Sequence, residues 1–192
     1  SAALIAPHGG SLVNRMVNEN EKKNLDHLPK IYISDLDMIN VEQIAIGSYS
    51  PLEGFLIKND VESVLNNYKL QNGIIWTLPI MLQVEKKQLE NINLNDTVAL
   101  CLKGSDEVYA QMKIDDLYSY DLNSLAKRIF FTNDESYPGV KRLVQGGNSF
   151  IGGKIKMFKR LPSKLKNYEI TPNQTRTIFT NKNWIRFAFS IN

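Results

Sequence analysis

Apolar residues recur about one helical turn apart in four stretches of the chain, and this spacing predicts four short helices. The stretches are 35–46, where one or two turns are expected, 60–69, 123–131 and 137–143. Gly47 and Gly73 follow the first two stretches and are typical helix-ending residues. Asp60 is suited to cap the second helix, and Asp121 or Asn123 is suited to cap the third.

Other stretches are rich in β-branched and aromatic residues and predict strands. They are 25–34, 74–84, 94–103, 108–120 and 150–161. Apolar residues occupy every second position from Val108 to Ile114, as in a half-buried strand. Pro79 has no N–H to donate, so it belongs at an edge, bulge or bend, and Gly152 and Gly153 predict a bend before the last strand. Several short strands joined by glycine and proline turns favour a small barrel over a β-α-β array, so we expect an α+β, mainly β fold.

The amino-acid composition limits the classes of protein to which the chain can belong. The chain has 192 residues, of which 43% are apolar and 22% charged, with a net charge of +3. These values are typical of a globular domain, and we see neither a signal peptide nor an apolar run of the ~20 residues that a membrane span needs. The single cysteine, Cys101, lies in an apolar run and is expected to be a buried core residue, which fits a reducing, cytoplasmic location. With only His8 and His27 besides, a structural zinc site is nearly excluded, and we expect no metal and no cofactor.

No familiar catalytic motif is present. The sequence contains no GxxxxGK[ST], GxGxxG, HExxH or GxSxG pattern. Two carboxylate pairs, Asp35 with Asp37 and Asp115 with Asp116, could in principle serve acid–base chemistry, but they stand in turn contexts and are better interpreted as turn and cap residues. We therefore assign no catalytic residue.

Two segments are candidates for contacts with anions. Near the start, His8, Gly9, Gly10 and Arg15 could form an anion-holding loop, because adjacent glycines free the backbone and the ring and guanidinium offer donors. The alternative is a tight turn whose His and Arg hold neighbouring carbonyls and acids, and local physics favours it. Later, the basic stretch 154–166 contains a candidate phosphate-facing patch, for which a solvated strand and loop is the favoured alternative. The patch residues are Lys154, Lys156, Lys159 and Arg160.

The last segment has a different pattern. Thr171, Pro172 and Gln174 form a capping-box arrangement, which predicts a helix to about residue 181. The aromatic run 184–192 then reads as the first strand of another unit. A core strand needs partners on both sides, and the sequence supplies none after it, so Trp184–Phe189 could mediate self-association.

Five strings in order resemble the N-terminal domain of sulfate adenylyltransferase, also called ATP sulfurylase. They are PHGG (7–10), IGSYSPLEGF (46–55), GIIWTLPIML (73–82), YPGVKRL (137–143) with IGGKI (151–155), and TPNQTR (171–176). The resemblance covers essentially the whole chain. It implies a PUA-like N-terminal domain over 1–169, a mixed β-barrel with short peripheral helices. It also implies that 170–192 are the helix and first strand of a truncated nucleotide-binding α/β domain.

The chain departs from the family's pattern at three places. Tyr137 and Gln174 stand where the family usually has His and Glu, and the Q-T/V-R-N-P-x-H-x-x-H motif that binds nucleotide and sulfate has no counterpart. The family makes adenosine 5′-phosphosulfate and pyrophosphate from ATP and sulfate, and clustered His and Arg donors are needed to stabilise the reacting anions. The resemblance thus implies a non-catalytic module, inactive by itself, whose partner is the missing catalytic domain or another subunit. His8, Gly9, Gly10 and Arg15 would anchor that interface. Two alternatives stay open: an RNA-binding PUA-like module, which is not favoured, and a protein-interaction module that uses Trp184–Phe189.

Overall fold

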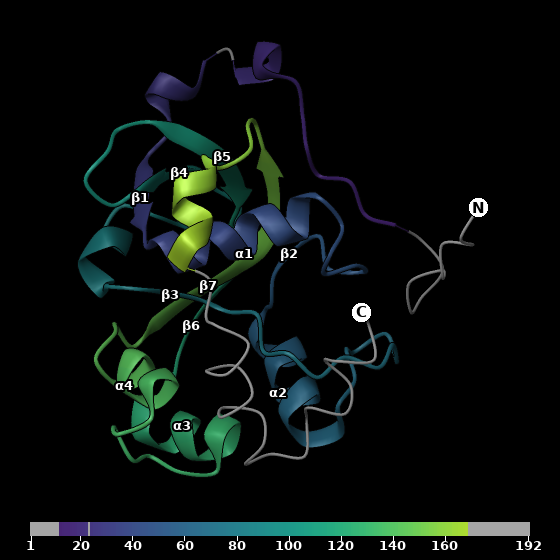
Figure 1. Ribbon diagram of the computed structural model, residues 1–192, viewed down its shortest axis with the longest axis vertical. Coiled ribbons are helices and arrows are strands. Elements are labelled where there is room, and N and C mark those ends of the chain that lie inside the picture. The colour runs from purple at the N-terminus through teal and green to yellow at the C-terminus, as the bar shows by residue number, and fades with distance from the viewer. Residues whose placement is uncertain (1–11, 23, 169–192) are drawn as a thin grey trace.

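The computed structural model describes residues 12–22 and 24–168 (Figure 1). Within them the four predicted helices are confirmed. They are α1 (Asp35–Ala45), α2 (Lys58–Asn67), α3 (Leu122–Phe130) and α4 (Pro138–Val144). Four short 3-10 helices accompany them: η1 (Glu19–Lys22), η2 (Leu25–His27), η3 (Lys86–Leu89) and η4 (Ser163–Tyr168). The predicted helix 171–181 and the aromatic strand 184–192 lie outside the described residues.

Two of the described helices begin with a side-chain cap, one of which was predicted, and the cap predicted for a third helix is wrong. The hydroxyl of Ser34 caps α1, which at 11 residues is longer than one or two turns. The carboxylate of Asp121 accepts a hydrogen bond from the Ser124 amide, as predicted for a cap of α3. The prediction for Asp60 is wrong, because α2 begins one turn earlier after Ile57. Asp60 instead accepts a hydrogen bond from the backbone N–H of Gln71, at 2.8 Å.

Seven strands form one mixed sheet. They are β1 (Lys30–Ile33), β2 (Gly54–Phe55), β3 (Leu82–Val84), β4 (Thr97–Leu102), β5 (Val108–Lys113), β6 (Asp116–Ser119) and β7 (Ser149–Met157). The main path is β1-β4-β5-β7-β2, and β3 and β6 also pair with β7. β1 runs parallel to β4, whereas the other pairs are antiparallel. The expected α+β, mainly β fold is confirmed, in the form of a half-barrel.

The half-barrel depends on β7, which pairs with four different strands. Its first half lies between β3 and β6, and its second half lies between β2 and β5. The change of partners falls at Gly152 and Gly153, which lie inside the strand rather than in a bend before it. Gly153 has a φ of 153°, and a Cβ there would lie 1.8 Å from the carbonyl oxygen of Lys113. A side chain is therefore excluded where the sheet folds over itself.

The stretch 108–120 forms two strands, so the prediction of one continuous strand is wrong. The chain breaks at Ile114 and Asp115, whose amides donate to the carbonyls of Asp96 and Gly152, each at 2.8 Å. These bonds turn β6 away from β5, so the two strands pair with different halves of β7. In the stretch 74–84 only β3 joins the sheet, in agreement with the bend expected at Pro79.

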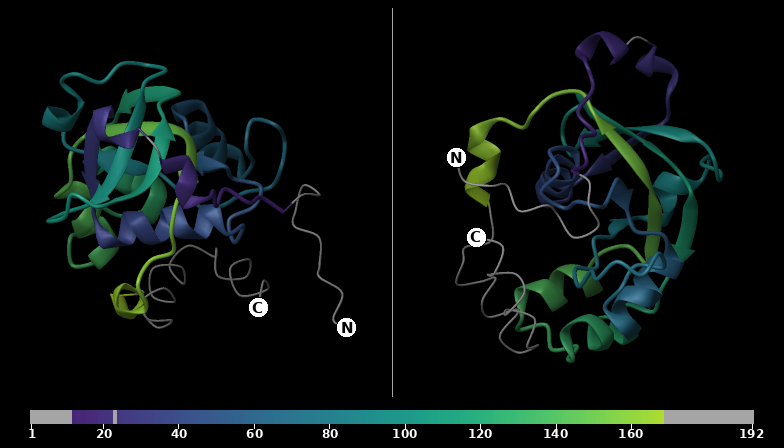
Figure 2. Two further views of the ribbon diagram at one scale, coloured as in Figure 1. Left: turned by 90° about the horizontal axis from the view of Figure 1, so that it is seen from above. Right: turned by 90° about the vertical axis from the view of Figure 1, so that its right-hand side faces the viewer.

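The core lies on both faces of β4. Val98 and Leu100 join the main apolar cluster, while Ala99 and Cys101 face a smaller one. Cys101 is fully buried, as predicted. In the right-hand view of Figure 2 the strands form an arc beside α1, and α3 and α4 lie together at one end. Among the described helices, none has the length and apolar character needed to cross a bilayer.

Candidate functional site

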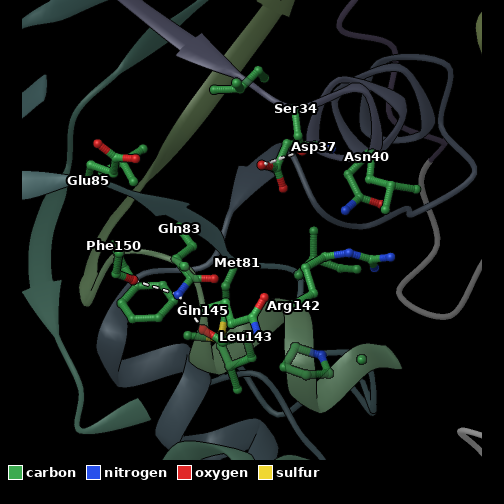
Figure 3. Close-up of a pocket in the computed structure, with 18 of the residues that line it drawn as sticks. Ser34, Asp37, Asn40, Met81, Gln83, Glu85, Arg142, Leu143, Gln145 and Phe150 are labelled. Carbon is green, nitrogen blue, oxygen red and sulfur yellow. Dashed lines mark hydrogen bonds between the residues drawn. The ribbon is translucent and has the colours of Figure 1, made fainter. Parts of the chain in front are cut away.

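A cavity of about 640 Å³ lies between the start of α1, the segment that leads into β3, and α4 (Figure 3). Its volume falls in the range of roughly 300–1,000 Å³ that is usual for small-molecule sites. Its walls come from five parts of the chain that are distant in sequence. The lining residues are Tyr32–Ser34, Leu36, Asp37, Asn40, Leu78–Met81, Gln83–Glu85, Gln88, Lys103, Ile129, Phe130, Gly139, Arg142, Leu143, Gln145–Gly147 and Phe150.

An aromatic pair outside the cavity braces two of its walls. The hydroxyl of Tyr49 donates to Oδ1 of Asn40 at 3.4 Å, and its ring meets the ring of Trp76 edge-on at 6.2 Å. The indole N–H of Trp76 in turn donates to the carbonyl of Leu78 at 2.6 Å. Asn40 and Leu78 both line the cavity. Tyr49 and Trp76 therefore fix the spacing between α1 and the segment before β3.

The opposite wall is held by Gln83 of β3. Its side-chain amide donates to the carbonyls of Leu143, at 2.9 Å, and Gly147, at 2.5 Å. The Leu143 carbonyl lies in the last turn of α4, where carbonyls have no partner inside the helix, and Gly147 lies in the segment that follows α4. A Cβ on Gly147 would lie 2.2 Å from the carbonyl oxygen of Val84. Because Gly147 has no side chain, the segment after α4 can approach the backbone of β3 closely, and this holds α4 next to β3.

Asp37 is the carboxylate on the α1 side of the cavity. Its Oδ2 accepts a hydrogen bond from the Ser34 hydroxyl at 2.9 Å, while its own amide donates to the Ser34 Oγ at 3.2 Å. Burial raises the pKa of Asp37 to about 6, although the Ser34 bond and the charges of Lys103 and Arg142 act in the opposite direction. The cap of α1 is therefore Ser34, and Asp37 stands in the first turn of the helix beside it and also in the cavity wall.

Two cations face the same cavity, Arg142 on α4 and Lys103 after β4. Both side chains are exposed. Within the described residues neither of them forms an ion pair or a side-chain hydrogen bond. Figure 3 shows Arg142 on one side of the hollow and Asp37 with Asn40 on the other. The site therefore combines a largely apolar lining with two cations that have no ion-pair partner among the described residues and with two carboxylates, Asp37 and Glu85.

Of the proposed anchoring residues, His8, Gly9 and Gly10 lie outside the described residues. Arg15 is described, and its Nε donates to the carbonyl of Ile155 at 2.9 Å. Its guanidinium also lies 3.8 Å from the carboxylate of Glu53. The side chain thus holds a neighbouring carbonyl and a neighbouring acid, and it does not line the cavity.

The basic patch is largely paired with acids. Lys154 lies 3.1 Å from Glu53, and Lys159 pairs with Glu107. Arg160 reaches Oε2 of the buried Glu42 at 3.1 Å, and this oxygen also accepts from the amide of Leu161. Lys156 is exposed on β7. The patch is therefore spread over several ion pairs rather than gathered into one anion-binding surface.

The sequence analysis missed Asn40, Lys103 and Arg142 as candidate site residues. Arg142 lies in the string YPGVKRL, which was used only for the family resemblance, whereas Asn40 and Lys103 belong to none of the quoted strings. Only the fold brings the three residues to one cavity. The second carboxylate pair, Asp115 and Asp116, lies at the start of β6, where Asp116 accepts from the amide of Lys58 at 2.8 Å. Among the described residues, no group of three or more His, Cys, Asp or Glu could hold a metal ion.

The fold and its sequence match a known family model, described as a PUA-like domain, over residues 5–160. The chain belongs to the PUA-like domain family. A sulfate adenylyltransferase of Persephonella marina is 38% identical to this PUA-like chain over 188 residues, which cover 94% of the chain and 48% of the relative. One from Staphylothermus marinus is 35% identical over 182 residues, or 93% of the chain and 47% of the relative. The chain thus spans about half the length of the curated relatives it matches.

A solved structure supports the fold assignment. The hexameric APS kinase from Thiobacillus denitrificans superposes with a TM-score of 0.64 at 22% identity, over 94% of the PUA-like chain and 32% of that protein. At this level of identity the match concerns the fold.

Proposed function

We propose that the chain is the N-terminal, non-catalytic PUA-like module of a sulfate adenylyltransferase. The observation that carries the proposal is the extent of the similarity: 38% identity over 94% of this chain but only 48% of the Persephonella marina protein. The module would support a second half that performs the family's reaction, in which sulfate and ATP give adenosine 5′-phosphosulfate and pyrophosphate. Residues 1–169 would form the module, and 170–192 would begin the second domain.

The chemistry of the described residues favours a non-catalytic role for the module. The reaction joins two anions, so its transition state needs clustered cationic donors. In this module most guanidinium groups already hold carboxylates, as Arg15, Arg128 and Arg160 do. The 192 residues contain no counterpart of the family's Q-x-R-N-P-x-H-x-x-H motif. We expect the module to act in the cytoplasm with its catalytic partner half.

The proposal is tested with a chimera. This chain replaces the matching half of the Persephonella marina relative, and release of pyrophosphate from ATP is measured with and without sulfate. The chimera is expected to be active, and this chain alone is expected to give no sulfate-dependent pyrophosphate. The complete relative and its second half alone serve as controls.

Two results would contradict the proposal in different ways. Adenosine 5′-phosphosulfate made by this chain alone would show that the module is itself catalytic. A chimera that folds and assembles like the complete relative but has no activity would show that the module does not support a sulfate adenylyltransferase.

A further inference from the structure

The cavity beside α1 contains cationic groups that the fold does not use. Four arginines lie in the described part of the chain, and three of them pair with carboxylates: Arg15, Arg128 and Arg160. Among the described residues, Arg142 is the one of these four that has no carboxylate within ion-pair distance, and Lys103 also lacks such a partner there. Guanidinium groups bind carboxylates and phosphates through paired N–H donors. Arg142 therefore keeps its donors available at the cavity.

The acids near Arg142 do not cancel this charge by contact. Oδ2 of Asp37 is engaged by the Ser34 hydroxyl at 2.9 Å, and Glu85, which also lines the cavity, lies 3.3 Å from Nζ of Lys87. Lys103 and Arg142 influence Asp37 only through space. An incoming anion can therefore meet both cations without displacing an existing ion pair.

Polar side chains such as Asn40 and Gln83 share the lining with many apolar ones, and the apolar part selects what the anion can be attached to. Leu78, Met81 and Leu143 contribute to the walls of a cavity of about 640 Å³. A bare inorganic anion would leave this apolar surface in water, whereas burying an apolar body against it is favourable by roughly 25 cal/mol per Å². The walls are braced by Tyr49 and Gln83, so the space is formed before a ligand arrives.

We propose that this cavity binds a small organic anion, a carboxylate or a phosphate monoester carried on an apolar body, with Arg142 and Lys103 holding the anionic group. The proposal does not depend on the proposed function. It assigns a binding site to the PUA-like module that is separate from the chemistry of the second half.

The test is an NMR titration of the full 192-residue chain, labelled with 15N, using phenyl phosphate and benzoate as probes. At least one probe is expected to shift the amide signals of Asn40, Gln83 and Gly146, and the pair of probes distinguishes a phosphate from a carboxylate. Inorganic phosphate, which lacks the apolar body, and benzyl alcohol, which lacks the charge, are expected to bind at least about tenfold more weakly.

Matched variants locate the anionic group. Arg142→Gln is expected to weaken binding of the better probe at least about tenfold, and Lys103→Gln severalfold. Lys141→Gln removes the same charge from the neighbouring, exposed position of α4, outside the cavity, and is expected to change affinity less than about twofold. Unchanged amide signals in β4 and β5 verify that each variant is folded.

Four outcomes would overturn the proposal. These are no binding of either probe at millimolar concentration, signal changes centred away from the cavity, inorganic phosphate binding as tightly as phenyl phosphate, or equal losses for Arg142→Gln and Lys141→Gln. The last result would mean that the probes respond to the general charge of α4 rather than to a built site.

Discussion

Arg128 and Arg142 lie on two helices that pack against each other, but their guanidinium groups have opposite surroundings. Arg128 on α3 binds both carboxylate oxygens of Glu62 on α2, and it also donates to Oδ1 of Asn66 at 3.2 Å. The Tyr120 hydroxyl donates to the same Glu62 at 2.9 Å. Arg142 on α4 faces the cavity and has no such partner among the described residues.

The comparison shows how one residue type serves stability in one place and remains available in another. The hydrogen bonds that Arg128 donates to Glu62 join α2 to α3, and these bonds, with the Arg128 charge as a smaller contribution, keep the pKa of Glu62 below its usual value. The N–H donors of Arg142 face the cavity and have no carboxylate partner among the described residues. The following expected outcomes test this difference, from the largest effect to the smallest.

The largest effect is expected from Gly147→Ala, which would move the wall that carries Arg142. Its new Cβ would lie 2.2 Å from the Val84 carbonyl oxygen, so α4 or β3 must shift. We expect a loss of about 2–3 kcal/mol in the free energy of unfolding, measured by urea denaturation. Asn148→Ala, at an exposed neighbouring side chain, is the control and should change it by less than about 0.5 kcal/mol. Equal stability of the two variants would contradict the close seating of α4.

Arg128→Gln should lower the free energy of unfolding by about 1–2 kcal/mol. The ion pair between Arg128 and Glu62 is partly exposed, at 34% and 35% of the two side chains, and this exposure limits how much it stabilises the fold. Because it is made of two parallel hydrogen bonds, it should contribute more than an ordinary surface ion pair. Thermal and urea denaturation measure the loss. Lys127→Gln removes an exposed charge next to it on α3 and is expected to be nearly neutral. An Arg128 variant as stable as the Lys127 variant would show that the α2–α3 contact does not depend on this pair.

Asp37→Asn should change how stability depends on pH. Burial raises the pKa of Asp37 from about 3.8 to about 6 in the folded protein, so the folded state disfavours the charged form. The wild-type chain should therefore lose stability as the pH rises from about 4 through about 6, by about 1 kcal/mol once partial exposure is allowed for. The variant should lack this component. Unfolding free energies at pH 5 and pH 8 provide the measurement, and parallel pH profiles would contradict the assigned pKa.

Arg142→Gln is expected to have the smallest effect on stability, below about 0.5 kcal/mol, because its side chain is exposed and forms no ion pair with the described residues. The same denaturation series that measures Arg128→Gln measures it. A loss as large as that of Arg128→Gln would mean that Arg142 stabilises the fold, and the comparison between the two arginines would fail.

The helices and most strands could be predicted because their signals are local. Spacing of apolar residues located α1 to α4, and Asp121, one of the two cap candidates for α3, is the cap that the structure shows. The burial of Cys101 followed from its apolar neighbours. The break between β5 and β6 was missed because alternation of side chains continues through Ile114, while the change of pairing is decided by Gly152 on a distant strand.

The cavity could not be predicted for a related reason. Asp37 was noticed only as a cap residue, since its local partner is Ser34. Its relation to Arg142 depends on Gln83 and Gly147, which seat α4 against β3. Contacts of this kind join segments far apart in the chain and leave no periodic pattern in the sequence.

The position of β7 in the chain has a consequence for how the module is made. Strands β2, β3, β5 and β6 all pair with β7, which is the last strand of the described sheet. During synthesis these four strands lack their common neighbour until residues 149–157 have left the ribosome. Pairings over such long sequence separations form slowly, and unpaired strand edges expose the nascent chain to aggregation. The half-barrel can therefore be completed only late in biosynthesis, after β7 has emerged to pair with these four strands.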